Sequence, residues 1–274
     1  MSNLQVRIIS SIVLAAVVLS LTWLGGPWFR VLACFIGAAV FYEWTVMSGG
    51  VTHAAQRPLA IAAAIGLAIF LLCLLLAVPA IYLFALGAAL VLLLAIWWKA
   101  AGEGGWQVSG LFYAIASSAP LALLRGADQQ GLIAILFLFA VVWSTDIFAY
   151  FVGRAVGGPK LAPSISPGKT RSGALGGALG AVVAGVVVVL TTGAGHPAAL
   201  AVAALALSVV SQAGDLFESW VKRRHGVKDS GWLIPGHGGV MDRVDGLVVA
   251  ALALYLMGLL AGNADAPAHA LFGM

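Results

Sequence analysis

The chain has 274 residues, of which 62% are hydrophobic and only 9% are charged, and its formal net charge is +4. Ordinary soluble domains have about 25% charged residues, so this composition excludes a water-soluble globular protein and indicates lipid as the main solvent. At about 20 residues per spanning helix, the chain holds eight or nine spans and no separate soluble domain. The basic excess is typical of cytoplasmic loops and explains the charge better than nucleic-acid binding does.

Apolar runs long enough to cross a membrane follow one another, separated by short turn or polar segments. We predict nine spans, at 8–24, 31–48, 58–77, 80–98, 107–124, 131–153, 173–192, 198–214 and 246–262. Only Val78-Pro79 divides the third span from the fourth. The fold class is therefore all-α, a polytopic integral membrane protein of about nine transmembrane helices with a polar cavity in its C-terminal spans.

Orientation follows from the loops. With the N-terminus in the cytoplasm, 12 of the 14 Lys and Arg residues fall on the cytoplasmic side, and only Arg30 and Arg125 lie opposite. Such a split is the positive-inside pattern, and with nine spans it places the C-terminus outside. We therefore expect the loops 154–172 and 215–245 to face the cytoplasm.

Charge is uneven along the chain. Six of the ten acids and nine of the fourteen bases lie between Asp146 and Asp245. In the first 125 residues, Glu43 is the only acid at membrane depth. We therefore predict an N-terminal scaffold of about five spans over 1–130, and a catalytic region of about four spans over 131–274, with cytoplasmic loops 154–172 and 215–245.

The densest polar stretch begins at the end of the eighth span. Asp215, Glu218 and Lys222 stand at i, i+3 and i+7, so a helix would present all three on one face, with Ser211 one turn earlier. Ionisable groups at membrane depth are costly, which favours a functional interpretation.

Asp242 and Asp245 form a second acidic pair, three residues apart at the start of the ninth span. Taken alone, the pair is typical of an ordinary helix start. Beside Asp215, Glu218 and many bases, a bound cation is the better interpretation, because two acids on one turn repel and Mg²⁺ prefers hard oxygen ligands.

The segment Pro235-Gly-His-Gly-Gly239 lacks bulky side chains, so its backbone N–H groups could approach phosphate oxygens, although a tight turn is an equal alternative. Lys222, Arg223, Arg224 and Lys228 supply positive charge for a polyphosphate or an anionic lipid headgroup. His237 is expected to be a hydrogen-bonding loop residue rather than a general base.

Asp146 lies near the end of the sixth span, and a lone acid in such a helix requires a partner, a cavity or a proton. The following loop contains Gly168-Lys-Thr170, but Pro163 stands where a P-loop requires glycine. Lys169 and Arg171 remain candidate phosphate contacts through their charge.

The run S-x-x-K-R-x-x-x-x-K-D-x-G-x-x-x-P-G-H-G-G-x-x-D-R-x-D over Ser219–Asp245 resembles the hallmark of the phosphatidate cytidylyltransferase (CDP-diacylglycerol synthase) family. Gln212–Ser219, Asp146-x-x-Ala-Tyr150 and Ser166-Pro-x-Lys-Thr170 fit the same family. The resemblance covers about 140–246, and Gly168 and Ser172 depart from the usual Lys and Glu.

The resemblance implies that the protein transfers a cytidylyl group from CTP to phosphatidic acid, giving CDP-diacylglycerol and pyrophosphate. It implies Mg²⁺, with more than one cation per site, on Asp215, Asp242 and Asp245. The implied catalytic residues are Asp146, Asp215, Glu218, Lys222, Asp242 and Asp245. The implied substrate-binding residues are Ser166, Lys169, Thr170, Ser219, Arg223, Lys228, Asp229, His237, Gly238, Gly239 and Arg243.

The expected partners are CTP, phosphatidic acid and membrane lipid, with no nucleic acid; a homodimer is left open. One alternative is a CTP-dependent transferase for another lipid, such as an ether-lipid or polyprenyl phosphate. The other is a secondary transporter, which predicts polar residues in both halves of the chain, whereas here they gather in one.

Overall fold

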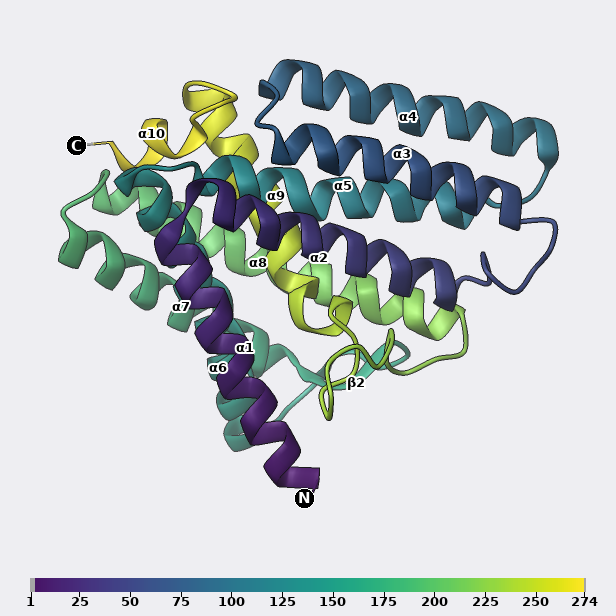
Figure 1. Ribbon diagram of the computed structural model, residues 1–274. Helices are drawn as coiled ribbons and strands as arrows, with labels where there is room; N and C mark the ends of the chain where they lie inside the picture. The colour runs from purple at the N-terminus through teal and green to yellow at the C-terminus, as the bar shows by residue number, and fades with distance from the viewer. Residues whose placement is uncertain (1–2, 274) are drawn as a thin grey trace. The chain divides into compact units, whose positions relative to one another are not determined.

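The computed structural model describes residues 3–273. Its helices are α1 (Asn3–Leu24), α2 (Gly26–Met47), α3 (Arg57–Leu75), α4 (Ala80–Ala101), α5 (Gly105–Arg125), α6 (Gln129–Val156), α7 (Arg171–Thr192), α8 (Pro197–Arg224), α9 (Met241–Ala261) and α10 (Pro267–Phe272). Two strands, β1 (Lys160–Ala162) and β2 (Ser166–Thr170), form an antiparallel hairpin between α6 and α7. Figure 1 shows this order along the chain.

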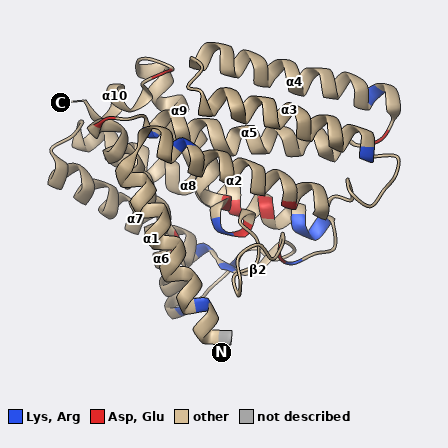
Figure 2. Cartoon of the chain, viewed as in Figure 1, with Lys and Arg blue, Asp and Glu red and all other residues tan. Residues whose placement is uncertain are grey.

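Nine helices of the described chain, α1 to α9, are long and apolar enough to cross a membrane. Large apolar side chains such as Ile81, Leu179 and Leu260 are exposed along them, which is unfavourable in water and favourable in lipid. Figure 2 shows that most of the length of these helices is made of residues other than Lys, Arg, Asp and Glu. The predicted all-α, polytopic integral membrane protein with about nine spans is therefore confirmed.

The span boundaries differ from the prediction where helices continue past the apolar run. The division at Val78-Pro79 is present, because α3 ends at Leu75 and α4 begins at Ala80. α8 extends ten residues beyond the predicted end at 214, to Arg224, before Gly226 with its φ of 71°. Basic residues in this last turn suit the negative end of the helix dipole, which explains the longer helix.

The described residues form two compact units. The first comprises residues 3–122 and 225–244, and the second comprises 123–224 and 245–273. The predicted functional division at residue 130, into scaffold and catalytic region, remains a prediction.

The first unit is built around α2. α2 packs against α1 and α3, and α3 packs against α4 (Figure 1). Trp44 is buried and donates from its indole N–H to the carbonyl of Trp106 at 2.7 Å, with the ring of Tyr113 at 5.3 Å. Gly110 provides the space for this indole, because a Cβ there would lie 2.6 Å from the Trp44 ring.

The second unit is built around the pair α6 and α7, and α7 also packs on α8. The short α10 packs on α6, where the rings of Phe137 and Phe272 meet edge to face at 5.3 Å. The C-terminal tail is thus held by an aromatic contact.

Candidate active site

Close backbone packing joins α6 to α7. A Cβ on Gly177 would lie 2.7 Å from the carbonyl oxygen of Thr145, and one on Gly173 would lie 2.6 Å from that of Ala149. Glycine is required at such contacts because any side chain would meet backbone that cannot move aside. The pair therefore places the C-terminal half of α6, which carries Asp146, beside the start of α7.

The hairpin leads directly into α7. Lys160 pairs with Thr170 across the two strands, and the Thr170 hydroxyl accepts from the backbone N–H of Gly173 at 3.1 Å as the N-cap of α7. This is an ordinary threonine cap, in keeping with the failed P-loop pattern. The cap fixes the neighbouring Lys169, whose ammonium group forms an ion pair with Asp215 of α8.

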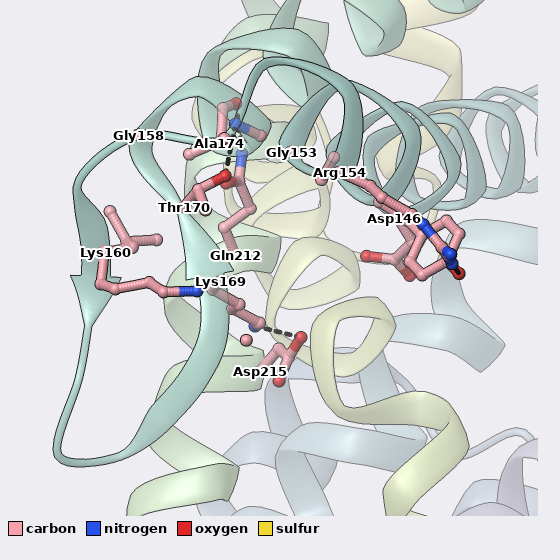
Figure 3. A pocket seen from close by; sticks show the side chains of 16 residues that line it. Asp146, Gly153, Arg154, Gly158, Lys160, Lys169, Thr170, Ala174, Gln212 and Asp215 are labelled. Carbon is pink, nitrogen blue, oxygen red and sulfur yellow. Dashed lines mark hydrogen bonds and ion pairs between the residues drawn. The ribbon is translucent and has the colours of Figure 1, made fainter.

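A cavity of about 610 Å³ lies between α6, the hairpin, α7 and α8. Asp146 projects toward it from α6, while Lys160 and Lys169 extend from the hairpin (Figure 3). Arg154 lines it as well and donates to the Tyr150 hydroxyl at 2.9 Å. Two acids and three bases thus share one polar pocket, an arrangement suited to a phosphate-bearing ligand.

The residues predicted to share a polar face at the end of the eighth span all lie within the helix α8. The Ser219 hydroxyl donates to Asp215 at 3.4 Å, and the fully buried Glu218 forms an ion pair with Lys222 at 3.0 Å. Of these four residues only Asp215 lines the cavity. The buried pair places Glu218 inside the packed region, where its charge compensates that of Lys222.

Two glycines let α8 and α9 cross closely in the second unit. A Cβ on Gly214 would lie 3.0 Å from the carbonyl oxygen of Asp245, and one on Gly246 would lie 3.1 Å from that of Ser211. Each glycine is adjacent in sequence to a candidate site acid, Asp215 or Asp245. The crossing therefore brings these two acids into one electrostatic environment.

Asp146, Asp215 and Asp245 repel one another, and the charges of Lys169 and Lys222 oppose that repulsion. Within residues 3–273, no three His, Cys, Asp or Glu side chains converge closely enough to hold a metal ion by themselves. The oxygen chemistry nevertheless fits Mg²⁺, which usually completes its shell with water and substrate phosphates.

Two of the remaining predicted residues lie in the second unit, Ser166 at the start of β2 and Arg223 in the last turn of α8. The others lie in the first unit, in the segment 225–244. Gly236 and Gly238 adopt φ of 76° and 86°, and an isolated bridge joins Ile234 to Gly238, so residues 234–238 form a tight turn. His237 is hydrogen-bonded through both ring nitrogens, to the hydroxyls of Ser10 and Ser11 at 2.9 Å. His237 is thus a hydrogen-bonding loop residue, as its sequence context indicated.

Asp242 and Arg243 also hold this turn. The Asp242 carboxylate accepts from the backbone N–H groups of Ser230 and Gly239, each at 2.9 Å. Arg243 donates to the His237 carbonyl at 2.6 Å, while Lys228 and Asp229 are exposed. The N–H groups of Ser230 and Gly239 thus bind a carboxylate of the protein itself.

Sequence reasoning assigned no site role to several residues that the structure brings to these sites. Arg154, Lys160 and Tyr150 line the cavity, and their polar types within the 143–172 region were the available signal. Glu43 is buried and accepts three hydrogen bonds from the segment 230–241. Its position as an acid within an apolar span was the signal, but its partners are almost 200 residues away.

Fold and site together define a class: an integral membrane protein with a charged cavity for a phosphate-bearing ligand. Residues 5–261 match the cytidylyltransferase family. The chain is 52% identical over 272 residues to the phosphatidate cytidylyltransferases of Brucella suis and Brucella melitensis, covering 99% of each chain. It is also 41% identical over 135 residues to that of Bacillus subtilis, covering 49% of this chain and 50% of that one. The chain belongs to the cytidylyltransferase family.

Proposed function

We propose that the protein is a phosphatidate cytidylyltransferase, which makes CDP-diacylglycerol and pyrophosphate from CTP and phosphatidic acid. The observation that carries the proposal is the 52% identity over 99% of both chains to relatives of that name. The cavity supports it, because lysine, arginine and aspartate side chains line it in a chain of which only 9% of the residues are charged.

In this reaction an oxygen of the lipid phosphate bonds to the α-phosphorus of CTP, and the bond to the β-phosphate oxygen breaks to release pyrophosphate. Such a transfer requires positioning and charge neutralisation more than covalent catalysis. Lys169, Lys160 and Arg154 would hold phosphate oxygens, and Thr170 would fix the direction of Lys169. The acyl chains can remain in lipid while the headgroup enters the cavity.

The acids would hold Mg²⁺, with Asp215 and Asp245 as ligands in the second unit and Asp242 as the candidate in the first. The metal supplies positive charge that neutralises the developing charge on phosphate oxygens. Asp146 would complete the polar wall. The repulsion among Asp146, Asp215 and Asp245 supports this assignment, because a cation relieves it.

We place the protein in the cytoplasmic membrane of a bacterium, with its N-terminus and the cavity on the cytoplasmic side. The distribution of Lys and Arg among the loops supports this orientation. CTP is a cytosolic nucleotide, so a cytoplasmic opening also suits the proposed substrate.

The test is pyrophosphate release by detergent-purified protein supplied with phosphatidic acid. Release that requires CTP, lipid and Mg²⁺ together is expected, with ATP inactive. Asp215→Asn and Asp245→Asn should lower the rate at least about a hundredfold, since each removes a charge from the reacting centre, while Glu103→Gln on an exposed loop should match the wild type. Release with ether-lipid or polyprenyl phosphate but not phosphatidate would move the proposal to those acceptors.

A further inference from the structure

Glu43 is a buried acid in a helix that is otherwise apolar. Its side chain is 1% exposed, and it lies in the last two turns of α2. A carboxylate in such a place is costly unless several donors compensate it. Glu43 has no role in the proposed reaction, so its burial must be explained by the groups that surround it.

Three hydrogen-bond donors to Glu43 come from one short segment of the first unit. One carboxylate oxygen accepts from the Val240 backbone N–H at 2.8 Å, and the other accepts from the Met241 N–H at 2.8 Å and the Ser230 hydroxyl at 3.0 Å. Val240 and Met241 stand at the start of α9, where backbone N–H groups have no partner within their own helix. Glu43 thus caps α9 from another helix, at the end where a negative charge is favourable.

Ser230 links this cap to a second carboxylate. Its hydroxyl donates to Glu43, while its backbone N–H donates to Asp242 at 2.9 Å. Gly239 donates its N–H to Asp242 and also lies against Glu43, because a Cβ on Gly239 would lie 2.5 Å from a Glu43 oxygen. Both ends of the segment 230–241 are therefore fastened to the same two carboxylates.

We infer that Glu43 is a positioning residue for the reaction, which acts by holding the segment 230–241 in its working conformation. The inference rests on the proposed function, because this segment carries Gly238, a residue predicted to bind substrate, and holds the carboxylate of Asp242, a candidate metal ligand. Glu43 does not line the cavity, and its three hydrogen bonds join it to the segment alone among the described residues. Its charge sets the shape of the segment, and with it the positions of Gly238 and of the Asp242 carboxylate.

The decisive variant is Glu43→Gln, which keeps the size of the side chain but turns one acceptor oxygen into an NH₂ donor that faces other donors. Ser230→Ala removes one of the three hydrogen bonds and leaves the charge in place. Glu103→Gln is the matched control, since it neutralises an exposed acid in a loop. With the rate normalised to folded protein, Glu43→Gln should raise the KM for CTP or phosphatidate at least about tenfold, and Ser230→Ala should raise it less.

A merely structural role would lower the melting temperature and the yield of folded protein but leave both KM values unchanged. Unchanged KM values in Glu43→Gln and Ser230→Ala would therefore overturn the inference. Should Glu43→Gln fail to fold, the Ser230→Ala result alone decides between the two roles.

A second measurement does not depend on activity. Trp232 lies within the segment and is 86% exposed, so a spin label on Trp232→Cys, in a background with Cys34 and Cys73 replaced by alanine, reports the mobility of the segment. Higher mobility in Glu43→Gln, but not in Glu103→Gln, is expected, and equal mobility would overturn the inference. Because this result stands even if wild-type protein shows no cytidylyl transfer, failure of the proposed function is distinguishable from failure of the inference.

Discussion

At the scale of single residues, Lys160 is a cation of the cavity without a neutralising acid. Lys169 pairs with Asp215, but no acidic side chain in residues 3–273 pairs with Lys160. We expect Lys160→Met to raise the KM for a phosphate-bearing substrate about tenfold, because a charge-assisted hydrogen bond contributes about 1.5–3 kcal/mol. Steady-state kinetics against Lys99→Met, a lysine outside the cavity, checks this; equal KM values in the two variants would contradict it.

Asp128 contributes to the stability of the fold, and its contribution depends on pH. It caps α6 by accepting from the Gly131 N–H at 2.8 Å and is hydrogen-bonded to His269 at 2.6 Å. Partial burial raises the pKa of Asp128, but these two hydrogen bonds and the nearby positive charges outweigh burial, so the pKa lies below its ordinary value. The ionised carboxylate therefore stabilises the fold at neutral pH.

The pH dependence follows from the sign of this shift. The stabilisation is fully present above the unfolded pKa of about 3.9 and is lost as pH falls through the lower folded pKa. It amounts to less than about 1 kcal/mol, because both side chains are about half exposed. We expect wild type to melt above Asp128→Asn at pH 6, and the difference to shrink at pH 3. Thermal unfolding in detergent checks this, and a constant difference would contradict it.

At the scale of elements, the α6–α7 pair depends on glycine. Gly177→Leu would force a side chain against the Thr145 carbonyl oxygen, since even a Cβ would lie 2.7 Å from it. Such overpacking costs about 1–3 kcal/mol, and it would also widen the cavity. The melting temperature of the purified variant should fall, whereas Val183→Leu on the same helix should not change it, because Val183 is 65% exposed. Equal melting temperatures for the two variants would contradict a requirement for glycine between α6 and α7.

Elements with one strong local signal were predicted from the sequence. The nine long helices followed from apolar runs, and the helical face of Asp215, Glu218 and Lys222 followed from their spacing. The hairpin β1–β2 was not predicted, because its five- and three-residue strands are short and carry Pro and Gly. The approach of α8 to α9 at Gly214 and Gly246 was equally hidden, since a glycine in a helix is no signal for a particular partner.

At the scale of the whole molecule, the membrane and the charge distribution together predict a topology. Single cysteines are placed at Ser164 and Trp232 in a background without Cys34 and Cys73. They should react with a membrane-impermeant thiol reagent only after the membrane is permeabilised. A cysteine at Asn263, beyond the ninth span, should react in intact cells. This outcome follows from the excess of Lys and Arg in the loops 154–172 and 215–245. Reaction of all three positions from the same side would contradict a count of nine spans.

The sequence by itself determined the class of protein, the number of spans and the part of the chain in which the charged residues gather. These depend on transfer of each segment from water to lipid and on helical periodicity, which are local properties of the chain. Only the tertiary structure decided which polar groups pair. Lys169 of β2 forms an ion pair with Asp215 of α8. Glu43 accepts hydrogen bonds from Ser230 and from the start of α9, which are 187 to 198 residues away in the sequence. Such pairings depend on which helices pack together, and that depends on small residues and shapes whose partners no local pattern specifies.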